Sequence, residues 1–104
     1  MIKVVFFQKK SVITGFEVSG HSMSAQHGQD IICAFVSSAC LMAANTVTEV
    51  IGLKAQSKMS DGYLKFAVTE NEEKAGAVLS GLRLHLAELE KDYPKNIKVT
   101  ISEV

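Results

Sequence analysis

Four side chains between residues 20 and 40 are of types that can do chemistry. Cys33 and Cys40 are thiols seven residues apart, and His21 and His27 precede them in a segment of small and polar residues. A cysteine beside a histidine can act as a nucleophile with its general base. Cysteine and histidine also bind zinc, and cysteine is among the residue types most often buried as plain packing. The residue types alone leave all three interpretations open.

The position of Cys33 makes a nucleophile chemically possible. Asp30 is a good N-cap residue, which would make Cys33 the third residue of a helix. Unpaired amides and the positive end of the helix dipole would stabilise a thiolate there. His21 follows Gly20 at the end of a strand pattern and could accept the thiol proton. From the pattern alone, packing remains the commoner role of a cysteine, above all for Cys40, which lies deeper in the helix.

The spacing argues against a disulfide or a zinc site. Two helical turns separate Cys33 from Cys40 by ~10 Å along the axis, which is too far for an intrachain disulfide. The same separation prevents both thiols from reaching one ion without distorting the helix. We therefore expect two free thiols, no metal and no cofactor. His27 is predicted to be a surface loop residue, and His85 a solvated residue on the polar side of a second helix.

Periodicity supplies the elements that would position these side chains. A chain of 104 residues that is 47% hydrophobic and 21% charged predicts one folded domain over residues 1–104. Strand patterns and helical apolar faces alternate along it. The predicted fold class is α+β, a mostly antiparallel sheet of about five strands with two helices, in the order β-β-α-β-β-α-β. Strands are predicted at 2–7, 12–18, 53–59, 63–68 and 97–101, with a turn at 60–62, and helices at 30–51 and from about 71 to 92.

Glycines and helix-capping residues refine the predicted boundaries of these elements. Gly15 indicates a bulge in the second strand, and Gly52 indicates the end of the first helix. The second helix is predicted to begin with a capping box formed by Thr69 and Glu72, or with Asn71 as the cap. Residues 21–29 have the composition of a mobile active-site loop.

The charge balance bears on partners and location. Eleven basic side chains offset eleven acidic ones, so no overall field would attract nucleic acid or an anionic membrane. The opening "MIKVVFFQKK" lacks the apolar run of a signal peptide or membrane span. We expect a cytoplasmic protein that binds neither nucleic acid nor membrane.

The motif around the candidate nucleophile resembles the ribosomal-processing cysteine protease family, Prp. "GH" at 20–21, a short loop of small residues and "GQDIICAFVS" at 28–37 match the family pattern Gly-His, variable loop, Gly-x-Asp-apolar-apolar-Cys-Ala-x-x-Ser. Chain length, the place of the motif after the first hairpin and the two-helix layout also match. The resemblance therefore covers essentially the whole chain.

The resemblance implies a role for each motif residue. Cys33 would be the nucleophile and His21 the general base, with Gly20, Asp30 and Ser37 supporting the site. Amides near Ala34 would hold the oxyanion.

The family further implies a substrate and an assembly. Its members remove an N-terminal extension, apolar and aromatic near the cut, from large-subunit ribosomal protein twenty-seven, and so support ribosome assembly. The resemblance also implies a homodimer, which the small and apolar surface of the first helix permits.

A non-catalytic, ribosome-associated interaction module is the alternative function. Its binding surface would be a sheet face that carries aromatic side chains, namely Phe6, Phe7, Phe16 and Phe66. Under this alternative, replacing Cys33 would leave binding intact.

Overall fold

The computed structural model describes residues 1–20 and 27–104, with side chains of the second range described from Ile31 onward. In chain order the elements are β1 (Ile2–Lys9), β2 (Val12–Ser19), α1 (His27–Asn45), a π-helical turn (Thr46–Ile51), β3 (Ala55–Ser60), β4 (Tyr63–Val68), a 3₁₀ turn (Glu72–Ala75), α2 (Gly76–Asp92) and β5 (Ile97–Glu103). The predicted α+β class with two helices and a mostly antiparallel sheet of five strands is confirmed.

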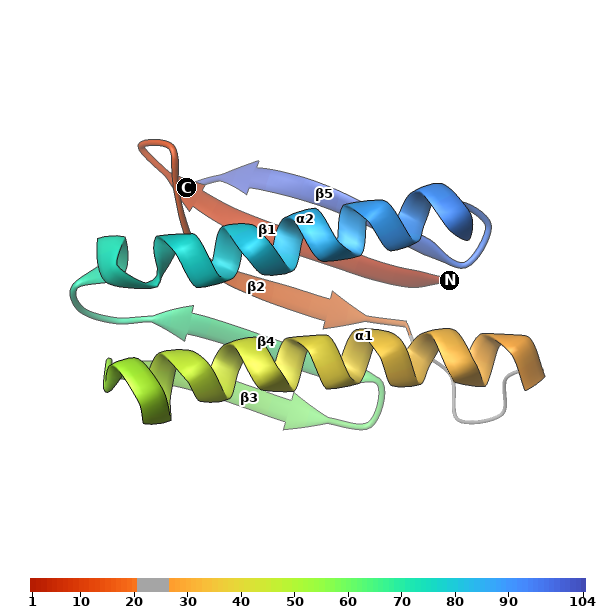
Figure 1. Cartoon of the computed structure of the whole chain (residues 1–104), viewed down its shortest axis with the longest axis horizontal. Helices are drawn as coiled ribbons and strands as arrows, with labels where there is room; N and C mark the ends of the chain where they lie inside the picture. Colours follow the sequence, from red (N-terminus) through yellow and green to blue (C-terminus); the bar gives the residue numbers. More distant parts are fainter. Residues whose placement is uncertain (21–26) are drawn as a thin grey trace.

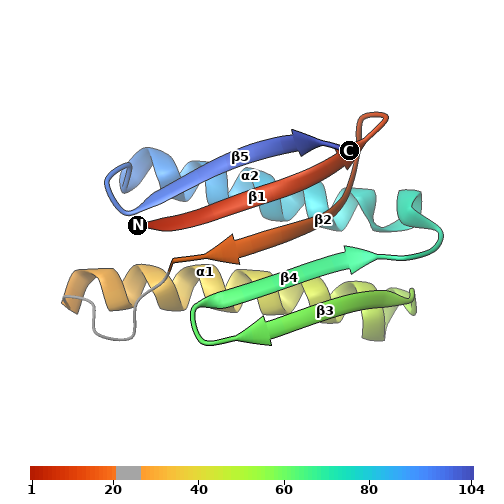
Figure 2. The ribbon, with the colours of Figure 1, turned by 180° about the vertical axis from the view of Figure 1, so that it is seen from behind.

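The strands form one sheet in the order β3-β4-β2-β1-β5. All neighbours pair antiparallel except β1 and β5, which are parallel. Both helices cover the same face of this sheet and run in opposite directions, α1 over the β3–β4 side and α2 over the β1–β5 side (Figure 1). The other face carries no helix among the described residues (Figure 2).

The core lies between the sheet and the two helices. Three aromatic rings from β1, β2 and β4 form its centre, with ring centroids 6.1 Å apart for Phe6–Phe16 and 5.5 Å for Phe16–Phe66. Phe7 points away from this layer, and the Lys65 Nζ lies 5.5 Å from its ring centroid. Three of the four aromatics proposed for an exposed binding face are therefore buried, which removes most of that surface.

The bulge predicted at Gly15 is present. The register between β1 and β2 shifts between Phe7 and Gln8, opposite Thr14. Gly15 also lies against β4 so closely that a side chain would overlap the carbonyl oxygen of Phe66. The glycine therefore permits both the bend and the close approach of the two strands.

The first helix begins earlier than predicted and ends where predicted. It begins at His27, three residues before the predicted cap, so the prediction that Asp30 is the N-cap is wrong. Gly28 lies within the added turn and costs the helix only about 1 kcal/mol, so it does not prevent the earlier start. At the other end the last turn is π-helical, and Gly52 ends it as predicted, in the left-handed conformation with φ of 85°.

The second helix begins without the predicted side-chain cap. Asn71 is left-handed with φ of 51° and makes no side-chain capping hydrogen bond, and a 3₁₀ turn over Glu72–Ala75 precedes α2. The backbone itself closes the turn, since the Lys74 N–H donates to the Asn71 carbonyl at 2.9 Å. The predicted end near Asp92 is confirmed.

Candidate active site

The two thiols of α1 occupy different environments. Cys33 is half-buried at the edge of the core, whereas Cys40 is 1% exposed within it. Burial raises the pKa of the Cys40 thiol to about 12, because its thiolate would lose hydration without gaining a partner. Cys40 therefore stays protonated and inert, as predicted, and Cys33 is the thiol that a substrate can reach.

The surroundings of Cys33 differ from the prediction in one respect. Because α1 begins at His27, Cys33 is the seventh helical residue rather than the third. In a regular helix each N–H bonds to the carbonyl four residues earlier, so the Ala34 N–H is committed to Asp30. In this helix the Ala34 N–H is therefore not free to hold the oxyanion, in contrast to the expectation.

Ser37 lies one turn beyond Cys33 on the same face of α1 and is half-buried. It lines a small cavity between α1 and the β3–β4 hairpin. This placement fits a residue that supports the site from within the fold.

Gly20 holds the backbone that leads into His21. Its φ is +88°, a left-handed value that favours glycine. A side chain at this position would overlap the Met1 carbonyl oxygen, and the Gly20 N–H donates to the Gly62 carbonyl at 3.2 Å. Conformation and crowding both require glycine, so the end of β2 is fixed between the start of β1 and the β3–β4 turn.

The remaining predicted residues are placed only in part. His21 lies outside the described residues, as do positions 21–26 of the predicted mobile loop 21–29. Positions 27–29 of that loop, which include His27, form the first turn of α1, and Asp30 follows them in the helix.

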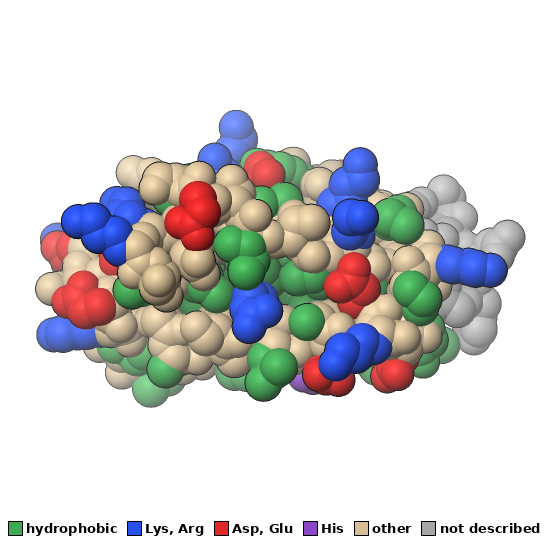
Figure 3. All heavy atoms as spheres, turned by 90° about the horizontal axis from the view of Figure 1, so that it is seen from above, with side chains coloured by type: hydrophobic (Ala, Val, Ile, Leu, Met, Phe, Trp, Pro, Cys, Tyr) green, Lys and Arg blue, Asp and Glu red, His purple; other side chains and the backbone are tan. Residues whose placement is uncertain are grey.

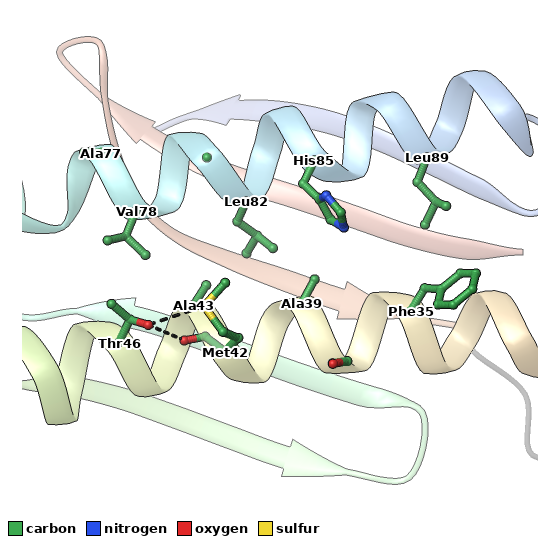
Figure 4. A pocket seen from close by; sticks show the side chains of 12 residues that line it. Phe35, Ala39, Met42, Ala43, Thr46, Ala77, Val78, Leu82, His85 and Leu89 are labelled. Atoms are coloured by element: carbon green, nitrogen blue, oxygen red, sulfur yellow. Dashed lines mark hydrogen bonds between the residues drawn. The ribbon is translucent and has the colours of Figure 1, made fainter.

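A second feature, which the sequence did not predict, is a groove between the two helices. It has a volume of about 870 Å³ and lies on the side of the helices that faces away from the sheet (Figure 4). One wall of the groove is formed by α1 and the π-helical turn, with Phe35, Met42 and Thr46. The other wall is formed by α2, with Val78, Leu82 and His85 (Figure 4). His85 is exposed as predicted, but it lies on the groove wall rather than on the polar side of α2.

Comparison with known proteins identifies the family. The model of the family described as "Cysteine protease Prp" matches residues 1–98. This chain belongs to the Prp family. Its members are cysteine proteases, which gives the enzyme class of the chain and makes Cys33, the accessible thiol, the residue of interest.

Relatives agree in sequence and fold. The ribosomal processing cysteine protease Prp of Bacillus subtilis (strain 168) is 33% identical over 95 residues, which cover 85% of each chain. The crystal structure of SMU.848 from Streptococcus mutans has a TM-score of 0.89 at 25% identity and covers 100% of this chain and 99% of its own.

Two further structures are of the essential ribosomal processing protease Prp from S. aureus, and each covers 98% of this chain and 100% of its own. One contains a substrate peptide and has a TM-score of 0.88 at 21% identity. The other contains a covalently linked product peptide and has a TM-score of 0.86 at 22% identity. At these identities the likeness shows a shared fold.

Proposed function

We propose that this Prp-family protein is an endopeptidase that removes the N-terminal extension of bacterial large-subunit ribosomal protein twenty-seven. Cys33 is the nucleophile and His21 the general base in this proposal. The observation that carries it is the contrast between the two thiols, one half-buried within the family motif and the other buried and protonated. The name of the B. subtilis relative, a ribosomal processing protease, supports the class of substrate.

The reaction is a thiol acyl transfer. His21 takes the Cys33 proton, and the thiolate attacks the scissile carbonyl to give a tetrahedral oxyanion. Collapse of this intermediate breaks the C–N bond, leaves a thioester on Cys33 and transfers the proton from His21 to the leaving amine. Water then attacks the thioester with His21 as base, which releases the free carboxylate and restores the thiol. A covalently linked product peptide in the S. aureus relative supports a route of this kind.

Asp30 and Ser37 support the site in this proposal. Asp30 is not the cap of α1, which begins before it, and its role in this proposal is to orient the His21 imidazole. Ser37, one turn after Cys33, is placed to hydrogen-bond the thiolate or to fix the helix against the hairpin.

We further propose that the enzyme is a homodimer that forms through the outer surface of α1 and the groove. Several large apolar side chains on this surface are exposed, among them Phe35 at 50% and Met42 at 64%. Residues 31–48 carry no charged side chain, so a second copy of the same uncharged surface is the best complement. Small residues along the groove, such as Ala39 and Gly81, allow helices to approach closely.

The same helix meets the length and apolarity of a membrane span, with a mean hydropathy of 1.8 over Ile31–Ile51. Its buried side, which includes Val36, Cys40 and Val47, packs on the sheet. In a helix packed against a sheet in this way, only the outer apolar side chains remain exposed to water. In the proposed dimer the second subunit buries them.

A cytoplasmic location without direct nucleic-acid binding completes the proposal. Acidic and basic side chains are interspersed among the described residues on the face that Figure 3 shows, with no patch of a single sign. A peptide extension on a ribosomal protein is a substrate that this surface can accept without contacting RNA.

The test is incubation of the purified enzyme with the extended ribosomal protein, with intact mass as the readout. We expect one N-terminal cut by the wild type and by Cys40→Ala. Neither Cys33→Ala nor His21→Ala should cut, although both should remain folded and bind the substrate. Loss of cleavage in Cys40→Ala equal to that in Cys33→Ala would contradict the role of Cys33. If the wild type also fails to cut and Cys33→Ala binds as well as wild type, the interaction module becomes the better account.

A further inference from the structure

The outer face of the sheet, which carries no helix in the part of the chain that the structure describes, has an uneven charge (Figure 2). Along each strand, the side chains that alternate with buried core residues point to this face. In the three rows of partners that cross the sheet at Lys3, Val5 and Phe7, the charged side chains are Lys3, Glu17, Lys58, Lys65 and Lys98. The whole chain has as many acidic as basic side chains, so four lysines against one glutamate make this face positive.

The four lysines form two pairs of like charge. Lys58 and Lys65 are register partners on β3 and β4. Lys3 and Lys98 are register partners on β1 and β5. Like charges beside each other on neighbouring strands destabilise a sheet. All four lysines are exposed, and neither of the two ion pairs among the described residues includes any of them. The repulsion within each pair is therefore not offset within the described fold, and an anionic partner would relieve it.

A hydrogen-bonded carboxylate lies between the two pairs. Glu17 on β2 is the register partner of Lys65 on β4 and of Val5 on β1. Its carboxylate accepts a hydrogen bond from the Tyr63 hydroxyl. The Lys65 Nζ lies instead 5.5 Å from the centroid of the Phe7 ring. The face therefore presents a negative centre between two positive ends.

We propose that this face is a docking surface for an acidic segment of a partner protein, in which two clusters of carboxylates flank a short uncharged stretch. Each cluster meets one lysine pair, and the uncharged stretch passes over Glu17. The inference goes beyond the proposed protease function and does not depend on it, because none of the charged residues of this face belongs to the candidate active site.

Strand geometry sets the spacing of the two clusters. The centres of the lysine pairs lie three strand spacings apart across the sheet, since the strand order is β3-β4-β2-β1-β5. They also lie two residues apart along the strands. At about 4.8 Å per strand spacing and about 3.4 Å per residue, the separation is about 16 Å. An extended polypeptide covers this distance in about five residues. Two Glu-Glu pairs separated by three uncharged residues therefore match the face.

Glu17 favours a polypeptide over a nucleic acid as the partner. A nucleic-acid strand carries a phosphate on every nucleotide, so a strand that spans both lysine pairs would place phosphates beside the Glu17 carboxylate. A polypeptide can place uncharged residues there. Nucleic acids also bind sheet faces by stacking bases on aromatic rings. Phe7 and Tyr63 are half-buried, and the Lys65 side chain lies beside the Phe7 ring. The face therefore supplies charge without an open stacking surface.

The docking surface remains accessible in the proposed dimer. Both helices cover the opposite face of the sheet (Figure 1), and the dimer is proposed to form through α1 and the groove. Cys33 also lies on α1, on the helix side of the sheet. An acidic partner can therefore bind the outer face without covering the nucleophile or the dimer surface.

Fluorescence anisotropy with a short acidic peptide tests the proposal. The probe is Glu-Glu-Ser-Ser-Ser-Glu-Glu with an uncharged fluorescent label, titrated with the wild-type protein at low salt. A peptide with Gln in place of every Glu is the control. We expect saturable binding of the Glu peptide alone. Its Kd should rise when salt is added, because salt screens interactions between exposed charges.

A double variant removes one lysine from each pair. Lys3→Gln combined with Lys58→Gln should raise the Kd for the Glu peptide by about 5-fold or more, since each exposed ion pair contributes a small part of the binding. Its urea midpoint should not fall, because each substitution removes a contact between like charges. Lys74→Gln combined with Lys91→Gln is the matched control. These lysines are exposed on the 3₁₀ turn and on α2, so the same change in net charge should leave the Kd unchanged.

The outcomes also separate a protein partner from RNA. Loss of affinity in the Lys3 and Lys58 double variant alone supports the docking surface. Equal loss in both double variants, or no saturable binding by the wild type at low salt, overturns it. An oligouridine of the same net charge as the peptide is titrated in parallel, and tighter binding of this RNA than of the Glu peptide overturns the choice of a protein partner. None of these measurements requires cleavage, so failure of the protease proposal would leave their result unchanged.

Discussion

The two thiols should differ in reactivity by a large factor. Cys33 is half-buried, whereas Cys40 is 1% exposed and protonated at any physiological pH. Since the thiolate is the reactive form, iodoacetamide should modify Cys33 rapidly and Cys40 only on the timescale of unfolding. Peptide mapping of a labelling time course measures both rates. If the two cysteines were labelled at equal rates in the folded protein, Cys40 would not be buried as described.

The buried Cys40 thiol also makes stability depend on alkaline pH. The fold raises the pKa of Cys40 to about 12, against about 8.5 in an unfolded chain. Between these values the unfolded state releases the proton first, so the free energy of unfolding falls as pH rises, by up to ~1.4 kcal/mol per pH unit. Below about pH 8.5 the protonated Cys40 thiol makes its full contribution to the free energy of unfolding.

Urea unfolding at pH 7, 9 and 10 measures this effect. Cys40→Ala should cost about 1 kcal/mol at pH 7 through lost packing and should show a shallower decline above pH 9. Cys33→Ala is the matched control and should keep the steep decline. Tyr63 adds to the decline in every variant, because its hydrogen bond to Glu17 raises the pKa of its hydroxyl. Parallel pH profiles for wild type and Cys40→Ala would show that the Cys40 thiol is not desolvated.

At the scale of the elements, the junction between β2 and the candidate active site depends on Gly20. Gly20→Ala places a methyl group against the Met1 carbonyl in a left-handed backbone. The backbone strain alone costs about 1–3 kcal/mol, and relief of the overlap would move the segment that leads to His21. We expect a lower urea midpoint. We also expect a lower kcat/KM than that of the wild type at temperatures where the variant is still folded.

Gly76→Ala is the control for this variant. Gly76 is the first residue of α2 with φ of -56°, and a methyl group added there would lie in ordinary contact with Val12, 3.6 Å from its Cγ1. Alanine should therefore raise stability by up to about 1 kcal/mol. Full activity in Gly20→Ala at a temperature where it is folded would show that this backbone does not position the site.

The elements themselves were largely predictable, and their boundaries less so. The apolar periodicity of α1 and α2 and the alternation of β1 and β5 follow from which faces are buried. The start of α1 was missed because Asp30 has strong capping chemistry, whereas the glycine before it costs a helix only about 1 kcal/mol and does not prevent an earlier start. Strand order could not be predicted, since the pairing of β5 with β1 depends on where α2 returns the chain.

The candidate site was predictable as a motif but not as geometry. Gly20, Cys33 and Ser37 carry the family spacing, and the structure supplies a physical reason for the glycine. Both cavities depend on how α1 packs beside α2 and beside the β3–β4 turn. That packing involves residues far apart in the chain, which no local pattern records.

At the scale of the whole molecule, a single charge on the outer face of α1 tests the proposed dimer. Met42→Glu introduces a charge at a 64%-exposed position on the groove and should convert the proposed dimer to a monomer. Ile101→Glu is the control, because Ile101 is 46% exposed on the edge strand β5 and lies outside the groove. Sedimentation velocity at several concentrations measures the mass. A wild type that stays monomeric, or a Met42→Glu variant that stays dimeric, would contradict this interface.

The central claim is that Cys33 attacks the substrate. The most direct measurement is peptide mapping of the enzyme after rapid acid quench of a reaction with the extended ribosomal protein, because acid preserves a thioester. The account predicts the acyl fragment of the extension on Cys33, and no adduct in Cys33→Ala. An acyl group on Cys40 or on a serine, or the same cut made by Cys33→Ala, would contradict it.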